Sequence, residues 1–163
     1  MRKRPAAGTF LAMAHWSATT TTKATPEQLL EVLTHPEEIR RWSPVDFDVD
    51  DLDTSRLAPG TRARVTGRLA GVRVGFDVEV HAADHDVLEL SADGPVGLDV
   101  RYELAPADAG SELCASVSLR RGGGITGRLV ANATAALLSA GALDGAAGRI
   151  ARAAESQPLL AAA

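Results

Sequence analysis

One tyrosine is the main candidate for chemistry in this chain. Tyr102 lies in an alternating run in which Leu98, Val100 and Leu104 share its face. Such period-2 alternation is typical of a half-buried strand, so we expect the Tyr102 hydroxyl to point inward, where it needs a hydrogen-bond partner. Three roles fit it: packing in the core with a water or backbone partner, a hydrogen bond to a ligand, or proton donation to a substrate.

Five further side chains are candidates for contacts with a ligand. Two are aromatic and three carry a hydroxyl or an amide, and they are Thr20, Thr22, Trp42, Phe76 and Asn132. Trp42 either caps the core or lines the entrance of a cavity. Asn132 lies beside the apolar stripe of a predicted helix, where a surface position and a position against a ligand both fit its amide. The two threonines would form a mildly polar patch on the inner face of a strand.

Metal and cofactor sites are not indicated by the spacing of the acidic residues and histidines. The acidic run 46–53 has Asp51 where a calcium loop needs glycine, and Leu57 where it needs glutamate. His81 and His85 lie at a strand end and a turn, with no third ligand nearby. We therefore expect no metal ion and no cofactor.

A catalytic thiol is also not expected. Cys114 alternates onto the polar face of its strand with Ser116 and Ser118. As the single cysteine it excludes an internal disulfide and fits a reducing, cytoplasmic location.

Seven antiparallel strands are expected to position these side chains. The alternation predicts them at about 11–24, 45–50, 62–69, 72–82, 88–92, 98–104 and 113–121, with turn residues between the last four. In the acidic run, Phe47 and Val49 point inward and the aspartates outward, which favours a solvated strand face.

Two short helices and one long helix complete the prediction. Thr25-Pro26-Glu27-Gln28 has the form of a capping box that begins a helix, His35-Pro36 ends it, and a second short helix at 37–41 leads to Trp42. From Ile125 to Ala154 the apolar residues follow a 3.6 period, which corresponds to a helix of about 45 Å if unbroken. A bend at Gly141, Gly145 or Gly148 is consistent with the helix-weakening effect of glycine.

The composition predicts one domain with space inside it. Of 163 residues, 45% are hydrophobic but only 4% are aromatic, so the core is built from small units. From the small residues Ala63, Gly67, Gly75 and Ala115, taken as inward, we expect a cavity of at least about 300 Å³. The net charge of -4 argues against nucleic-acid binding.

The ends of the chain are expected to lie outside this domain. Residues 1–10 are interpreted as a flexible basic leader, 11–154 as the single domain and 155–163 as a frayed tail. Pro5, Gly8 and Thr9 interrupt the short apolar run before Ala14, so a secretion signal is not favoured. No run approaches the length of about 20 residues needed for stable membrane insertion, and nothing indicates an oligomeric state.

The order of elements resembles a known superfamily. Together with the motifs Thr25-Pro26-Glu27-Gln28-Leu29-Leu30, Leu33-Thr34-His35-Pro36-Glu37 and Arg41-Trp42-Ser43-Pro44, it is similar to the helix-grip SRPBCC/START-like superfamily, in its bacterial polyketide cyclase/dehydrase and lipid-transport branch. The resemblance implies an α+β fold in which a seven-stranded antiparallel sheet wraps around a long C-terminal helix. It also implies an apolar cavity that takes lipids, sterols, quinones or polyketides, and some members cyclise, dehydrate or hydrolyse the ligand.

The resemblance is weaker at the site than in the fold. Trp42 is similar to the tryptophan that closes one end of the cavity in aromatase/cyclases. The arginine of those enzymes falls at Glu79 and a further tryptophan at Gly75, or at Val80 and Phe76 if the strand has a one-residue bulge. Neither alignment supplies the arginine that would anchor an enolate.

Three functions therefore remain as hypotheses. The favoured one is binding of a hydrophobic or aromatic small molecule, polyketide-like or lipid-like, in the cavity. The alternative is a cofactor-independent polyketide cyclase/aromatase or dehydratase, with Tyr102 as the catalytic proton donor. The third is an interaction protein whose core is simply filled.

Overall fold

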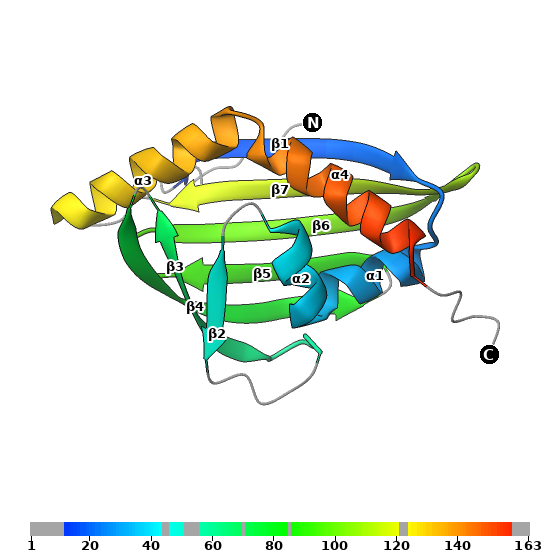
Figure 1. The fold of residues 1–163 in the computed structure, drawn as a ribbon, viewed down its shortest axis with the longest axis horizontal. Coiled ribbons are helices and arrows are strands. Elements are labelled where there is room, and N and C mark those ends of the chain that lie inside the picture. Colours follow the sequence, from blue (N-terminus) through cyan, green and yellow to red (C-terminus); the bar gives the residue numbers. More distant parts are fainter. Residues whose placement is uncertain are drawn as a thin grey trace.

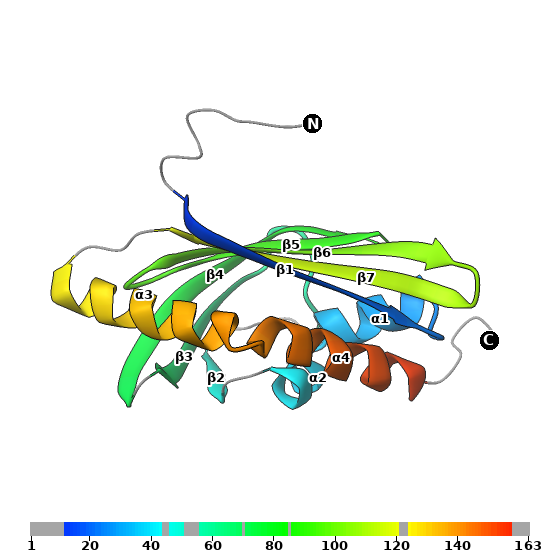
Figure 2. The same cartoon turned by 90° about the horizontal axis from the view of Figure 1, so that it is seen from above.

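Within the residues that the structure describes, the fold is a curved antiparallel sheet with four helices along one face (Figures 1 and 2). The computed structural model describes residues 12–43, 46–50, 56–69, 71–84, 86–120 and 124–157. The sheet has seven strands in the order β1-β7-β6-β5-β4-β3-β2. Strands β2 to β7 form a meander, and β1 pairs with β7 at one edge of the open sheet. This arrangement confirms the α+β helix-grip architecture expected from the sequence.

The strands are β1 (Ala12–Thr22), β2 (Phe47–Asp50), β3 (Arg62–Leu69), β4 (Val72–Asp84), β5 (Val87–Asp93), β6 (Gly97–Ala107) and β7 (Gly110–Arg120). The helices are α1 (Pro26–Thr34), α2 (Pro36–Trp42), α3 (Gly124–Ser139) and α4 (Ala142–Glu155). The predicted leader lies outside the described residues, as do 158–163 of the predicted tail.

Alternation assigns each strand residue to the inner or the outer face. In β7, Leu113, Ala115, Val117 and Leu119 are buried, and Tyr102 of β6 pairs with Ala115 on the same inner face. The faces predicted for these strands are confirmed.

One small residue lies on the other face from the one expected. A side chain at Gly75 would meet the guanidinium of Arg64, which lies on the outer face. The reason is the unbroken register of β3 and β4, which pairs Thr66 with Gly75 and leaves Val74 and Phe76 inward.

The long C-terminal helix is broken at Gly141. This residue has φ +99, a left-handed conformation that favours glycine, and α3 and α4 meet there at an angle of 60°. The bend turns α3 so that Gly127, Val130, Ala131 and Thr134 become its buried residues. Ile125 and Leu129, expected on the buried stripe, are instead 85% and 46% exposed.

The two helical segments cover different parts of the core. Ile150 and Ala154 of α4 join the larger cluster, which also contains residues of α1 and of β4 to β7. Val130 and Ala131 of α3 join a smaller cluster with Val74 of β4.

Hydrogen bonds fasten the end of α4 to the start of the chain's first helix. The Thr25 capping box is present, with Gln28 N donating to Thr25 Oγ1 at 3.1 Å and Thr25 N donating to Gln28 Oε1 at 2.8 Å. Gln28 Nε2 donates to the backbone oxygen of Gln157 at 2.9 Å, and Lys23 N donates to Glu155 Oε2 at 3.0 Å. The Lys23 amide and then the Thr22 hydroxyl lower the pKa of Glu155. Residues 155 and 157, expected in a frayed tail, are therefore tied to the domain.

Within the described ranges, no single helix is long and apolar enough to cross a membrane. The pair α3 and α4 meets the criterion of length and composition only when the two are counted together across their 60° bend.

Candidate ligand-binding cavity

An apolar cavity of about 350 Å³ lies between the inner face of the sheet and the helices. It is lined by residues from strands β2 to β7 and from all four helices, among them Trp42, Phe47, Phe76, Leu88, Tyr102 and Leu143. The volume meets the expectation of at least about 300 Å³. The described residues that line it include no acidic side chain, no histidine, no lysine and no arginine.

The walls of the cavity follow from the alternation of the strands. Phe47 and Val49 of β2 point inward, while Asp48 and Asp50 between and beside them are exposed. The same rule brings Phe76 of β4 into the lining. Because the charged positions of these strands face outward, the described residues of the cavity lining carry no charge.

Tyr102 brings a polar group into this apolar space. Its side chain is 6% exposed, and burial raises the pKa of its hydroxyl. Among the described residues, none forms a hydrogen bond with that hydroxyl. A buried hydroxyl without a partner costs about 1 to 3 kcal/mol, so this group is available to a molecule in the cavity.

Trp42 holds Tyr102 from the side. The two rings meet edge to face, with centroids 5.9 Å apart and an interplanar angle of 76°. Trp42 Nε1 donates to the backbone oxygen of Val32 at 3.1 Å, and Arg149 Nε donates to the backbone oxygen of Trp42 at 3.0 Å. The indole N–H is thus occupied, and Trp42 presents only apolar surface to the cavity.

Three of the residues predicted to contact a ligand lie outside the lining. Thr22 is buried on the inner face of β1, but its hydroxyl donates to Glu155 Oε2 at 2.7 Å and lies 3.2 Å from the backbone oxygen of Ala151. Thr20 is half-buried beside Leu113. Asn132 is exposed on α3. Of the six predicted residues, the structure brings Trp42, Phe76 and Tyr102 together around the cavity.

Comparison with known proteins identifies the family. The sequence pattern of the polyketide cyclase/dehydrase and lipid transport family matches residues 13–155. The chain belongs to this family. No curated protein is significantly similar to it.

Solved structures share the fold of this family member at low sequence identity. A protein from Chromobacterium violaceum is 14% identical with a TM-score of 0.66, covering 88% of this chain and 99% of its own. A Thermus thermophilus protein is 14% identical with a TM-score of 0.65, covering 88% and 98%. DynU16, a protein in the dynemicin biosynthetic locus, is 22% identical with a TM-score of 0.56; the match covers 87% of this chain and 47% of that one.

The cavity of this family member has no arginine from β4. Glu79 points to the outer face, where Arg62 Nη2 lies 3.7 Å from its carboxylate. Val80 is buried and Phe76 lines the cavity. A register shift does occur in β4, but between Val80 and Ala82, beyond the positions in question.

Sequence reasoning missed several residues of the lining. Thr134 and Leu138 of α3 contribute to the cavity, and so does Ser43 after α2, while Leu137 was already on the apolar stripe expected for this helix. The Thr134 hydroxyl donates to the backbone oxygen of Val130 at 2.8 Å, within its own helix. The available signal was the spacing of Thr134, Leu137 and Leu138, which are three and four residues apart and so share one face of a helix.

Proposed function

We propose that this protein binds an uncharged hydrophobic or aromatic small molecule, polyketide-like or lipid-like, in the cavity beneath its sheet. The observation that carries the proposal is the buried Tyr102 hydroxyl, which has no hydrogen-bond partner among the described residues and lies in a predominantly apolar cavity. Ligand pockets commonly combine an apolar wall with a few orienting polar groups. The family description, which includes lipid transport, supports the same reading.

The chemistry of the lining favours an uncharged ligand. A carboxylate or ammonium group moved from water into this space would lose its hydration and meet no opposite charge. A carbonyl or ether oxygen, in contrast, would accept a hydrogen bond from Tyr102. The preferred ligand therefore has an apolar body and one hydrogen-bond acceptor.

The cyclase or dehydratase alternative has less support at this site. Proton abstraction needs a base, and burial raises the pKa of Tyr102, so its hydroxyl keeps its proton at neutral pH. The described lining residues include no carboxylate or imidazole that could take that role. If the protein acts on its ligand, Tyr102 can donate a proton to the ligand or orient its carbonyl, while the cavity holds the ligand in a folded conformation.

A matched series of naphthalenes tests the proposal by calorimetry. We expect 2-acetylnaphthalene, an acceptor, to bind more tightly than naphthalene by about 0.5 to 1.5 kcal/mol, the net value of one hydrogen bond. We expect 2-naphthoate, which is charged, to bind most weakly. In Tyr102→Phe the advantage of the ketone should disappear while naphthalene still binds. Tighter binding of 2-naphthoate than of naphthalene, or an unchanged preference in Tyr102→Phe, would overturn the proposal.

A further inference from the structure

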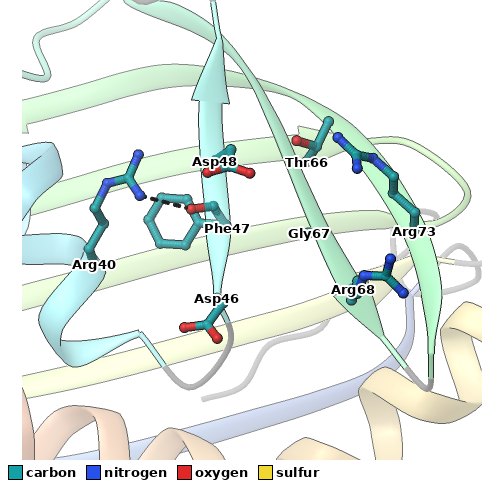
Figure 3. A pocket seen from close by; sticks show the side chains of 8 residues that line it. All are labelled: Arg40, Asp46, Phe47, Asp48, Thr66, Gly67, Arg68 and Arg73. Carbon is teal, nitrogen blue, oxygen red and sulfur yellow. Dashed lines mark hydrogen bonds between the residues drawn. The ribbon is translucent and has the colours of Figure 1, made fainter.

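A second hollow lies at the β2 edge of the sheet, around strands β2, β3 and β4 and beside Arg40 of α2 (Figure 3). It measures about 510 Å³. Charged side chains surround a floor made by Thr66 and Gly67, and they are Arg40, Asp46, Asp48, Arg68 and Arg73. We call this hollow the outer basin.

Two arginines form one wall of the outer basin. Arg68 of β3 and Arg73 of β4 are direct partners in the strand register. Like charges in directly opposite positions destabilise a sheet. In the part of the chain that the structure describes, neither arginine forms an ion pair or a side-chain hydrogen bond.

Within the described ranges, the lack of an ion-pair partner distinguishes Arg68 and Arg73 from the other outer-face arginines of the sheet. Arg62 pairs with Glu79 and Arg64 with Asp77 on the same two strands. Farther along the sheet, Arg101 pairs with Glu89 and Arg120 with Asp99. The guanidinium donors of Arg68 and Arg73 thus have no protein acceptor among the described residues, whereas those of their neighbours have one.

The opposite wall carries two carboxylates that also lack an ion-pair partner among the described residues. Asp46 and Asp48 flank Phe47 on the β2 side of the basin, and among the described residues neither forms an ion pair. Arg40, on the far side of β2, donates to the backbone oxygen of Phe47 at 3.1 Å, and its guanidinium lies 5.5 Å from the centre of the Phe47 ring. Positive and negative walls therefore face each other across Thr66 and Gly67 without joining.

We propose that the outer basin binds a small zwitterion that carries an oxyanion of phosphate type and an ammonium group. The oxyanion would accept charge-assisted hydrogen bonds from Arg68 and Arg73, whose forked guanidiniums match phosphate geometry, and it would remove their mutual repulsion. The ammonium group would face Asp46 and Asp48. The outer basin shares Phe47 with the lining of the cavity, but the charged groups that would bind the zwitterion are outside that lining, so this inference does not depend on what the cavity holds.

The test uses O-phosphoethanolamine as the probe and follows backbone amide shifts of the full chain by NMR. We expect saturable shifts at β2, β3 and β4, and weaker binding of inorganic phosphate and of ethanolamine, each of which meets only one wall. The double variant R68Q/R73Q should bind the probe more weakly, with a dissociation constant raised about tenfold or more. Arg62→Gln, on the same face of β3 but outside the basin, should leave binding unchanged.

A second measurement separates an effect on probe binding from an effect on folding. Without the probe, Arg68→Gln should unfold at the same or a higher temperature than the wild type, because it removes a like-charge pair. The probe should then raise the melting temperature of the wild type but not of R68Q/R73Q. The affinity of 2-acetylnaphthalene for the cavity should be the same in both proteins, which separates this result from the test of the cavity.

The same zwitterion can come from a soluble molecule or from a lipid headgroup, and a co-sedimentation assay distinguishes them. Binding to vesicles of equal phosphatidylethanolamine and phosphatidylcholine that is lost in R68Q/R73Q, without binding of the soluble probe, would assign the basin to the headgroup. Saturable binding of O-phosphoethanolamine without vesicle binding would assign it to a soluble ligand. Loss of neither interaction in R68Q/R73Q, or the absence of both in the wild type, would overturn the proposal.

Discussion

At the scale of single residues, the Tyr102 hydroxyl is the central polar group of the proposed ligand site. Sequence alternation was sufficient to place Tyr102 and Phe76 on the inner face, because the two-residue period of a strand assigns a face to every position. It could not place Thr20 and Thr22 relative to the cavity. Both have the inner parity, yet where a cavity opens along a strand depends on the helices that cover it.

The unpaired hydroxyl predicts an unusual stability for one variant. In ligand-free protein, Tyr102→Phe should leave the free energy of unfolding unchanged or raise it by about 1 kcal/mol, because it removes a buried polar group without a partner and keeps the ring. In Tyr102→Ala, the control, the free energy of unfolding should fall by about 3 to 5 kcal/mol, because the packing of the ring against Trp42 is lost. Urea unfolding measures both. A loss of more than 1 kcal/mol in Tyr102→Phe would show that the hydroxyl has a protein partner.

At the scale of elements, the break between α3 and α4 shapes the cavity. It places Thr134, Leu137 and Leu138 of α3 over one part of the lining, and Leu143 and Ala146 of α4 over the next. The sequence offered three glycines for a bend and no local reason to choose among them. Tertiary structure determines that the bend is at Gly141, since α3 and α4 each pack against a different part of the core.

Two alanine substitutions distinguish the glycine of the bend from a glycine inside the helix. Gly141→Ala should destabilise the protein by about 1 to 2 kcal/mol, because φ is +99 there and open space surrounds the missing side chain, so the cost is in the backbone. Gly145→Ala should stabilise it by about 0.5 to 1 kcal/mol, because an added Cβ would meet only the guanidinium of Arg149, at an ordinary contact distance of 3.4 Å. Thermal unfolding of the two variants measures this. Equal effects of the same sign would contradict the assigned position of the bend.

At the scale of the whole molecule, apolar and charged surfaces are sorted onto the two faces of one sheet. The strand pattern and the order of elements were enough to predict seven antiparallel strands, two short helices and a helical C-terminal segment. They were also enough to expect space inside, since the inward residues are small. The volume, and the contribution of α3 to it, follow from the 60° bend, which alternation does not encode.

The outer basin could not be read from the sequence for a similar reason. Arg68 and Arg73 belong to two alternating strands, and only the register of the β3 and β4 pair brings them to directly opposite positions. The acidic residues of 46–50 were correctly expected to be exposed, but their position across from those arginines depends on β2 pairing with β3.

The most direct test of ligand binding beneath the sheet is to locate a neutral ligand there by intermolecular nuclear Overhauser effects. With 2-acetylnaphthalene bound, we predict contacts from the probe to Trp42, Phe76 and Leu143, which come from α2, β4 and α4 and meet only around the cavity. Contacts confined to the exposed Ile125 and Leu129 of α3, with none to these three side chains, would contradict the claim that the space beneath the sheet is a binding site.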